Sequence, residues 1–339
     1  DRLMQIPALQ PVFAEPYNQI IRTQILAADP PDHTRIRALV NPPFTVPKVD
    51  TLRARIQAHV DRLIAAKADG RRMDFIRDFA YPLPFTMICD LLAVPDAERP
   101  PLEDYTHKLM RTTDPMPMSP YEVAGANYAA MGFRDYFLAL ATERSARPTD
   151  DLFGQMVAAR DRGALTDEEM VANVTLVFCA GHDTVVNLFG NGLYHLCRNP
   201  DQLELLRRDP SLMKNAVEEL LRYDASVQIA RRIPFQDVEI GGKTIFENQY
   251  ILCCLGAANR DPEVYPDPDR LDIMRKNIRP HSFGGGIHYC LGAQLARVEG
   301  EIVFRTILER MPELRLETED PEWHQNTFVR GLASLPIAW

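Results

Sequence analysis

The fold of this chain is decided by one stretch near its C-terminal end, Phe283-Gly284-Gly285-Gly286-Ile287-His288-Tyr289-Cys290-Leu291-Gly292. Glycines allow the backbone to turn tightly and to approach a flat ligand closely. Apolar residues recur at helical spacing after Cys290, so the cysteine is expected at the start of a helix. The free N–H groups and positive dipole end of a helix favour thiolate over thiol. A thiolate is the form that binds a metal, and haem iron is a well-known acceptor.

Two other interpretations of this stretch are weaker. A glycine-rich phosphate loop would need the Lys and the Ser or Thr of a P-loop, which are absent here. A zinc site would need further ligands at suitable spacing, and the sequence offers no second pair.

The composition excludes several classes of function. The chain has 339 residues, 46% of them hydrophobic, and a net charge of -9. An acidic chain is a poor candidate for binding nucleic acid or an anionic membrane surface. It has no run of about 20 apolar residues, so no membrane span is expected. Residues 1–10 lack the pattern of a signal peptide, and a cytoplasmic protein is expected.

The six cysteines do not form a disulfide framework, because they lie far apart and none is in a CxxC pair. Reduced thiols are the expectation. Cys290 is set apart by its loop, and the other five are expected to behave as small buried hydrophobes: Cys89, Cys179, Cys197, Cys253 and Cys254.

The pattern along the chain is mainly helical, with a smaller β-rich part towards the C-terminus. Apolar spacing and turn signals predict helices over residues 49–64, 121–144, 166–197 and 211–222, and after Cys290; short strands are predicted over 228–252 and 314–339. The chain has no repeats or flexible linkers, and its 27 prolines punctuate short loops. One continuous domain over residues 1–339 is therefore expected.

The helix predicted from Thr166 to about Cys197 has an unusual middle. Thr166-Asp167-Glu168-Glu169 forms a capping box at its start, and the run would be about 45 Å long at 1.5 Å per residue. Its centre is Ala180-Gly181-His182-Asp183-Thr184, where a glycine and polar residues fit a helix poorly. Local rules that break inside an element often mark a functional site.

The pattern Phe-x-x-Gly-x-His-x-Cys-x-Gly is matched by Phe283, Gly286, His288, Cys290 and Gly292. It resembles the haem-binding loop of the cytochrome P450 family, in its soluble bacterial type. The resemblance covers about Asp29 to the end, and implies a P450 fold that lacks the usual N-terminal helix and strands. It also implies haem b with Cys290 as axial ligand, contacted by Phe283, Gly284, Gly292 and Ala296.

The resemblance gives roles to the middle of the long helix. Gly181, beside Ala180, would leave room for dioxygen, Thr184 would hydrogen-bond the bound oxygen, and Asp183 would pass protons in from water. O–O cleavage needs protons, so an acid–alcohol pair has a direct purpose. The alternatives are a plain surface carboxylate for Asp183 and a hydroxyl of Thr184 that bonds back to its own helix.

Glu219-Leu220-Leu221-Arg222 is similar to the family's Glu-x-x-Arg, and at this spacing both side chains share one helix face. Arg270 is the expected third member of the network. A buried charge triad is costly unless fully paired, so its role would be to fix the haem loop. By itself the motif could be a common surface pair.

Four residues are expected to bind the haem propionates by resemblance: His33, Arg37, Arg232 and His288. Arginine suits a carboxylate because its planar fork donates two hydrogen bonds at once. Arg231 is the alternative to Arg232, and His281 could also reach a propionate.

The substrate pocket is expected to be apolar, lined by Val177, Ala180, Val227, Ile229, Phe328 and Val329. Met110, Met116 and Met118 could form part of its lid, or belong to the core.

The implied activity is hydroxylation, or another oxidation, of an apolar small molecule by a haem-thiolate monooxygenase. No flavin or nicotinamide domain is fused here, so electrons are expected from a ferredoxin with an NAD(P)H-dependent reductase. Arg53, Arg55, Arg297 and Arg305 could form the docking patch, or be scattered solvated residues. A monomer is expected. The alternatives are a peroxide-driven oxidase, an isomerase or dehydratase, and a non-catalytic haem sensor or carrier; the Asp183-Thr184 pair argues against the first and the last.

Overall fold

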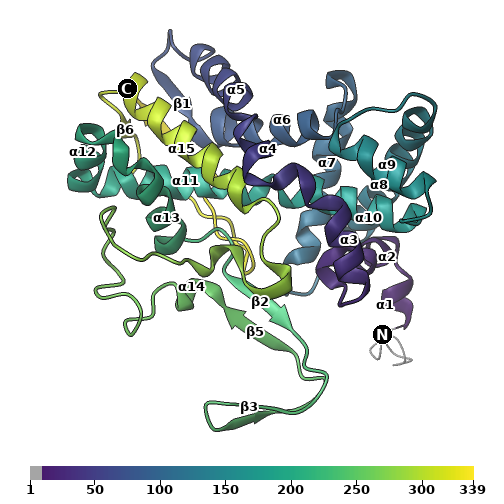
Figure 1. Cartoon of the computed structure of the whole chain (residues 1–339). Coiled ribbons are helices and arrows are strands. Elements are labelled where there is room, and N and C mark those ends of the chain that lie inside the picture. Colours follow the sequence, from purple (N-terminus) through teal and green to yellow (C-terminus); the bar gives the residue numbers. More distant parts are fainter. Residues whose placement is uncertain (1–9) are drawn as a thin grey trace. The chain divides into compact units, whose positions relative to one another are not determined.

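The computed structural model describes residues 10–339 (Figure 1). Residues 1–9, within the stretch that lacks a signal-peptide pattern, lie outside this range. The contacts divide the chain into two compact units. Unit 1 comprises Asp1–His59 and Tyr81–Asp183, and unit 2 comprises Val60–Ala80 and Thr184–Trp339. The single continuous domain stays a prediction.

Unit 1 is helical except for its loops. Its helices, with the 3-10 turns marked η, are α1 (Gln10–Ala14), α2 (Pro16–Thr23), η3 (Ile25–Ala27), α3 (Asp32–Val40), η4 (Pro42–Phe44), α4 (Val46–Asp50), the first half of α5 (Arg53–Ala65), α6 (Pro82–Leu91), η6 (Asp96–Glu98), α7 (Arg99–Met110), η7 (Arg111–Thr113), α8 (Pro120–Ala146), α9 (Leu152–Asp161) and α10 (Asp167–Ala180).

The core of unit 1 is built around α8, which contacts α2, α7, α9 and α10. Phe133, Phe137 and Phe178 are fully buried there, and the rings of Phe133 and Phe178 meet edge to face with centroids 5.5 Å apart. Such aromatic pairs contribute about 0.5–1.5 kcal/mol each beyond the burial of their surface. The core thus holds α10, the helix that leads to the predicted oxygen-binding stretch.

The capping box at the start of α10 is confirmed. Thr166 Oγ1 accepts a hydrogen bond from the Glu169 N–H at 3.1 Å, and Glu169 Oε2 accepts one from the Thr166 N–H at 2.9 Å. Glu169 also pairs with Arg35 of α3, and Arg35 donates to the Ala164 carbonyl at 2.8 Å. The side chain of Glu169 therefore fixes both the start of α10 and the position of α3.

The continuous helix predicted from Thr166 to Cys197 is wrong: it is two helices, α10 and α11 (Asp183–Arg198). The Gly181 N–H still bonds to the Val177 carbonyl at 3.2 Å, but the His182 N–H turns to the Cys179 carbonyl at 3.4 Å, three residues back. Glycine costs the most conformational entropy in a helix, which makes this the natural place for a break. The interruption falls within the stretch that the sequence singles out.

One described segment, Asp167–Arg198, is long and apolar enough to span a membrane by composition. However, 72% of its most apolar window is buried inside the protein, as in a core helix.

Unit 2 combines helices with short strands. Its elements are the second half of α5, β1 (Arg72–Asp74), η5 (Ile76–Ala80, a π-helical turn), α11, α12 (Pro200–Arg208), η8 (Pro210–Leu212), α13 (Met213–Tyr223), β2 (Ile229–Arg232), β3 (Val238–Ile240), β4 (Lys243–Ile245), β5 (Ile251–Cys254), α14 (Leu255–Ala258), η9 (His281–Phe283), η10 (Gly286–His288), α15 (Ala293–Arg310), β6 (Arg315–Leu316) and β7 (Pro336–Ala338).

The strands of unit 2 form three small antiparallel sheets. β7 lies between β1 and β6, β2 pairs with β5 with Ile229 opposite Cys254, and β3 pairs with β4. The β3–β4 hairpin extends away from the β2–β5 ribbon (Figure 1). The prediction of a mainly helical chain with a smaller β-rich part is confirmed.

Helix α15 packs against α13 in the core of unit 2. A Cβ on Gly300 would lie only 3.3 Å from Val217 of α13, so the glycine allows the two helices a close approach. The buried side of α15 includes Val298, Val303 and Phe304, all fully buried. This packing fixes the helix that follows Cys290.

The expectation of five buried cysteines holds for Cys89 and Cys179 and is wrong for Cys253 and Cys254, which are exposed. Both lie on β5, whose outer residues are not covered by another element of unit 2. Cys197 is half-buried, and no cysteine forms a disulfide.

Glu299 gives unit 2 a testable dependence on pH. It is 1% exposed on α15, and burial raises the pKa of its carboxyl to about 8. Because the unfolded carboxyl ionises near 4.5 while the folded one keeps its proton, folding stability must fall as pH rises between about 4.5 and 8. Glu299→Gln should flatten this part of the stability–pH curve in urea denaturation. Glu309→Gln, an exposed residue on the same helix, should leave the slope as in the parent; equal slopes for both variants would contradict the assignment.

Candidate haem-thiolate site

The cysteine loop, residues 281–292, is closed by its own backbone. The Cys290 N–H donates to the Phe283 carbonyl at 2.9 Å. One tight turn ends at Phe283, and a second, Gly286–His288, lies between the two bonded residues. Gly284 and Gly286 have φ of 68° and 67°, a left-handed conformation that side chains rarely adopt. Helix α15 begins at Ala293, so the predicted position of Cys290 just before a helix N-terminus is confirmed.

The outer face of the cysteine loop fits a flat apolar group. Cys290 is exposed, although cysteine is among the residues most often buried, and Ile287 and Tyr289 are 47% and 40% exposed. A Cβ added at Gly284, Gly285, Gly286 or Gly292 would meet nothing within 4 Å. Phe283 and His288 are half-buried, and Ala296 is buried one turn into α15. The donor set, one cysteine sulfur amid glycines and apolar residues, suits the axial side of a haem.

The predicted Glu-x-x-Arg pair forms a fully buried ion pair behind this loop. Arg222 Nε donates to Glu219 Oε2 at 2.7 Å and Arg222 Nη2 to Oε1 at 2.8 Å, and both side chains are 0% exposed. The remaining guanidinium hydrogens reach main-chain carbonyls: Asn259 and Pro268 at 2.9 Å, and Arg270 at 3.3 Å. A buried pair is tolerated only when its donors and acceptors are satisfied, as here.

The third member of this network is Arg275, and the prediction of Arg270 is wrong. Arg275 Nε lies 3.2 Å from Glu219 Oε1, and its side chain is 9% exposed. Arg270 is exposed and contributes only its carbonyl oxygen, which accepts from Arg222 and Arg275. The chain turns between the two arginines, because the Arg275 N–H bonds to the Asp272 carbonyl, and this turn directs Arg275 inward.

Asn259 connects the ion pair to the cysteine loop. Its carbonyl accepts from Arg222, while its buried side chain accepts from the His281 N–H at 2.7 Å and donates to Ser282 Oγ at 3.0 Å. Ser282 Oγ in turn donates to the Leu221 carbonyl on α13. A continuous set of hydrogen bonds, buried at Glu219 and partly buried at Ser282, thus runs from the ion pair to the residue before Phe283. The carbonyl of Phe283 in turn holds the Cys290 N–H.

Arg297 supports the loop from α15. Its guanidinium pairs with Glu218, lies 4.5 Å from the centroid of the Phe283 ring, and donates to the Tyr289 hydroxyl at 3.2 Å. It is therefore a structural partner of the loop and not a scattered solvated residue, while its role in docking stays a prediction. Of the other three candidates, Arg53 pairs with Asp50 at 3.0 Å, and Arg55 and Arg305 are exposed.

The predicted oxygen-binding stretch is a short run of exposed and partly exposed residues between two buried segments of the chain. Between Met170 and Leu193 every residue is buried except Leu176 and four residues of the stretch 180–184. Ala180 is exposed, and Gly181, Asp183 and Thr184 are partly exposed. Asp183 and Thr184 are the first two residues of α11.

Gly181 is closely packed on the side where a side chain would lie. A Cβ there would lie 2.5 Å from Ile88 Cδ1 and 3.2 Å from the Val177 carbonyl. Gly181 therefore makes room for Ile88 of α6, and the room for dioxygen stays a prediction. Ala180, by its exposure, is the small residue that faces open space.

His182 is fully buried at the centre of this stretch. Its Nε2 lies 3.2 Å from the Tyr81 carbonyl oxygen, and its Nδ1 lies 3.1 Å from Asp183 Oδ1. The sequence gave no role to this residue, because nothing in the spacing of the residues around it predicts its burial.

The predicted propionate partners divide between the units. In unit 1, His33 is buried and Arg37 is half-buried, four residues apart on α3. In unit 2, Arg232 is exposed at the end of β2, while Arg231 lies 5.6 Å from the centroid of the Phe328 ring. His281 is exposed. Strand alternation thus separates the two arginines and leaves Arg232 as the accessible one.

Four predicted pocket residues come together in unit 2. Val227 and Val329 face each other in a β-bridge, and the Gln228 N–H donates to the Phe328 carbonyl at 2.9 Å. Val227 and Phe328 are partly exposed, whereas Ile229 and Val329 are buried. In unit 1, Val177 is buried, Met110 and Met118 are half-buried, and Met116 is 58% exposed.

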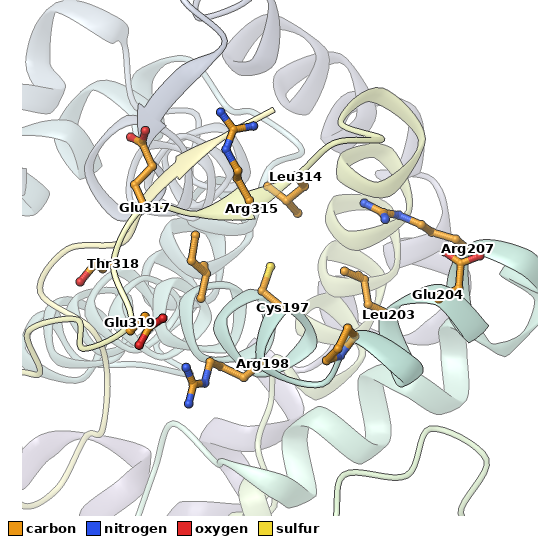
Figure 2. A pocket seen from close by; sticks show the side chains of 12 residues that line it. Cys197, Arg198, Leu203, Glu204, Arg207, Leu314, Arg315, Glu317, Thr318 and Glu319 are labelled. Carbon is orange, nitrogen blue, oxygen red and sulfur yellow. The ribbon is translucent and has the colours of Figure 1, made fainter.

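A cavity of about 750 Å³ in unit 2 is not part of this site (Figure 2). It is lined by Cys197, Arg198, Pro200, Leu203, Glu204, Arg207, Leu314, Arg315, Leu316, Glu317, Thr318 and Glu319. None of the predicted site residues is among them. Three arginines and three glutamates line it, and burial raises the pKa of the Cys197 thiol to about 11, so the thiol stays protonated.

The comparisons with known proteins agree with the geometry. The family model described as Cytochrome P450 matches residues 8–336. The chain belongs to the cytochrome P450 family. It is 39% identical to cytochrome P450 monooxygenase PikC of Streptomyces venezuelae over 322 residues, which cover 93% of this chain and 76% of that protein.

Other members of the family extend the likeness. The chain is 36% identical over 329 residues to 6-deoxyerythronolide B hydroxylase of Saccharopolyspora erythraea, covering 96% of this chain and 80% of the hydroxylase. P450BioI in complex with hexadec-9Z-enoic acid ligated acyl carrier protein has a TM-score of 0.91 and 34% identity, over 96% of this chain and 84% of that one. The protein is a P450 monooxygenase of the bacterial type, with haem b as its cofactor.

The revised network makes a prediction that separates two nearby arginines. Arg275→Ala removes a buried partner of Glu219 and should lower the free energy of unfolding by roughly 2–4 kcal/mol, close to the cost of breaking a buried pair. Arg270→Ala removes an exposed side chain and should stay within about 0.5 kcal/mol. Urea denaturation followed by circular dichroism, with haem content per chain, measures both. The reverse order would restore Arg270 as the third member.

Proposed function

We propose that this P450 oxidises an apolar small molecule with dioxygen and two electrons from a separate ferredoxin and its NAD(P)H-dependent reductase, with Cys290 as the axial ligand of the haem iron. The observation that carries the proposal is the exposed Cys290 in a glycine loop fixed by a buried ion pair. A fully buried ion pair is costly unless fully paired, and here the Glu219–Arg222 pair fixes a loop whose cysteine is exposed. Such an arrangement suits a sulfur that binds a ligand.

The bound haem supplies the activation of dioxygen, and the protein supplies ligation, orientation and protons. Cys290 presents its sulfur at the N-terminus of α15, where the helix dipole favours the thiolate. Phe283, Gly284, Gly292 and Ala296 form the surface around it. Four residues are assigned to the propionates: His33, Arg37, Arg232 and His288.

Asp183 and Thr184 are assigned to proton delivery. The Asp183 side chain is 25% exposed at the first residue of α11, so its carboxyl can exchange protons with water. The hydroxyl of Thr184 is the adjacent group that can hold a proton and pass it on. Ser226 Oγ donates to the Thr184 carbonyl at 2.7 Å, which fixes the first turn of α11 within unit 2.

An apolar substrate is supported by two kinds of observation. Val227 and Phe328 present partly exposed apolar side chains in unit 2, and Met116 does so in unit 1. Among the relatives, one hydroxylates 6-deoxyerythronolide B and another is seen with a hexadecenoyl chain on an acyl carrier protein. Val177, Ala180, Ile229 and Val329 complete the proposed pocket.

The remaining assignments follow the family. We place the protein in the cytoplasm as a monomer, with one haem domain over residues 1–339, in keeping with a family match over residues 8–336. The separate electron donor is proposed on the same ground, the resemblance to bacterial members of the family.

The thiolate assignment is tested by the carbon monoxide spectrum. Reduced protein with carbon monoxide should show the strongly red-shifted Soret band of a thiolate-ligated haem. Cys290→Ser should lose this band, because a hydroxyl is a much poorer ligand for the iron. Cys253→Ser changes another exposed cysteine and should keep the band. A red-shifted band that survives Cys290→Ser would overturn the assignment.

Proton delivery is tested by the coupling of electrons to product, once a spin-state screen has found a substrate. Asp183→Asn keeps the shape of the side chain and loses the acid, so product per NAD(P)H should fall by about 10²-fold, the lower end of general-acid effects. Hydrogen peroxide should account for the lost electrons. Asp135→Asn, an exposed residue on α8, is the matched control. Unchanged coupling in Asp183→Asn would mean that another group delivers the proton.

A further inference from the structure

His182 stands out in the stretch 180–184, because it is 0% exposed while its four neighbours are partly exposed. An imidazole buried in an apolar place needs partners for both of its ring nitrogens. Unit 1 provides one partner for each nitrogen, and they are of different kinds.

The first partner fixes the tautomer of the ring. The Tyr81 carbonyl oxygen, 3.2 Å from His182 Nε2, can only accept a hydrogen bond. The Nε2 atom must therefore carry a hydrogen, and in a neutral ring the Nδ1 atom then has a lone pair. The hydrogen bond to Tyr81 therefore fixes the orientation of the imidazole ring, with Nε2 towards the Tyr81 carbonyl.

Tyr81 is a rigid anchor. Its ring stacks on His107 of α7 with centroids 5.2 Å apart, and its hydroxyl lies 2.5 Å from His107 Nε2. Burial raises the pKa of Tyr81 far above its usual value, and the charges of Glu103 and Asp183 act in the same direction. The hydroxyl therefore keeps its proton, and its hydrogen bond with His107 ties the residue that precedes α6 to α7.

The second partner of His182 is the acid itself. Nδ1 lies 3.1 Å from Asp183 Oδ1, without the alignment of a hydrogen bond, and has no other hydrogen-bond partner among residues 10–339. A lone pair on Nδ1 facing a carboxylate oxygen is unfavourable unless a proton lies between them. The separation of 3.1 Å is within hydrogen-bond reach, so a proton on either group would favour the alignment in which the pair shares it and the Asp183 side chain is held in one orientation.

The surroundings of His182 strengthen this contact. The rings of Tyr81 and Phe85 meet the imidazole edge-on, with centroids 4.2 and 5.6 Å away. Interactions between polar groups are stronger where aromatic side chains exclude water. The other titratable groups of this region are Glu103, His107 and Cys179, and burial raises the pKa of the Cys179 thiol well above its usual value. Among the described residues, Asp183 is the one acid recorded in contact with the ring.

We propose that His182 is a positioning residue for proton delivery: anchored through Nε2 on the Tyr81 carbonyl, it orients the Asp183 carboxyl and holds a proton against it through Nδ1. The inference rests on the function proposed for Asp183. A purely structural role would need only the Nε2 anchor, and the two roles therefore depend on opposite sides of the ring.

Two substitutions separate these roles. The amide of His182→Asn occupies the place of Nδ1 and can still donate to Asp183, whereas the amide of His182→Gln reaches the place of Nε2 and can still donate to Tyr81. If His182 positions Asp183, His182→Gln should lower product per NAD(P)H on the order of 10-fold and raise hydrogen peroxide, and His182→Asn should recover most of the coupling. The opposite order would show a structural role only.

Folding is checked independently of activity. Both variants should keep the red-shifted carbon monoxide band and bind the spin-shifting substrate, so that a loss of coupling is not a loss of haem or substrate. Should one of them fail to fold, the spectroscopic test below decides without it.

A readout without turnover is the ¹⁵N spectrum of histidine-labelled holoenzyme in its diamagnetic reduced carbon monoxide form. The His182 signals, assigned by their loss in either variant or by selective coupling to Tyr81 carbonyl ¹³C, should show a hydrogen on Nε2. The Nδ1 signal should move in Asp183→Asn, while the Nε2 signal should change little. A hydrogen on Nδ1 alone, or an Nδ1 signal indifferent to Asp183→Asn, would overturn the proposal.

The two hypotheses fail in different ways. If Asp183→Asn leaves coupling unchanged, the proposed proton delivery is wrong, and the role of His182 falls with it. If Asp183→Asn uncouples the enzyme but His182→Gln does not, proton delivery stands and only the positioning role is lost.

Discussion

The buried ion pair of Glu219 and Arg222 is the interaction on which the cysteine site depends. Two opposite charges with no exposure to water are stable only if every donor and acceptor around them is used, and here Arg275, Asn259 and main-chain carbonyls complete the set. This requirement fixes the loops that supply the partners. Through Asn259 the same network reaches residues 281 and 282, and so determines where Phe283 holds the backbone of Cys290.

The cysteine loop itself is built from weak elements. Short 3-10 turns and glycines with left-handed backbone have little stability of their own, and α15 begins only after Cys290. Rigidity is supplied from two sides, by the ion pair through Asn259 and by Arg297 through Phe283 and Tyr289. The sulfur can therefore remain exposed without the loop collapsing onto it.

At the break between α10 and α11, as in the cysteine loop, an exposed functional group lies on a short segment that its surroundings hold in place. The group here is the carboxyl of Asp183. Buried helices on either side hold a short partly exposed stretch, and within it His182 is turned inward and Asp183 outward. The tertiary contacts of His182 with Tyr81 restrain a carboxyl that would otherwise be a mobile side chain. The proton delivery that we propose for Asp183 needs both access to water and a fixed direction, and this arrangement provides the two together.

The sequence by itself determined the family, the cysteine, the capping box of α10 and the Glu-x-x-Arg pair, because each is encoded by residues only a few positions apart. It failed where contacts join distant segments. Arg275, and not the predicted Arg270, pairs with Glu219, because a turn between the two arginines decides which guanidinium points inward. The close packing of Ile88 on Gly181 was not predicted either, because it depends on where α6 packs. The break between α10 and α11, the contacts of Arg297 with the cysteine loop and the burial of His182 were not predicted for the same reason. Spacing along a chain fixes the face of a helix, whereas only tertiary packing fixes what that face meets.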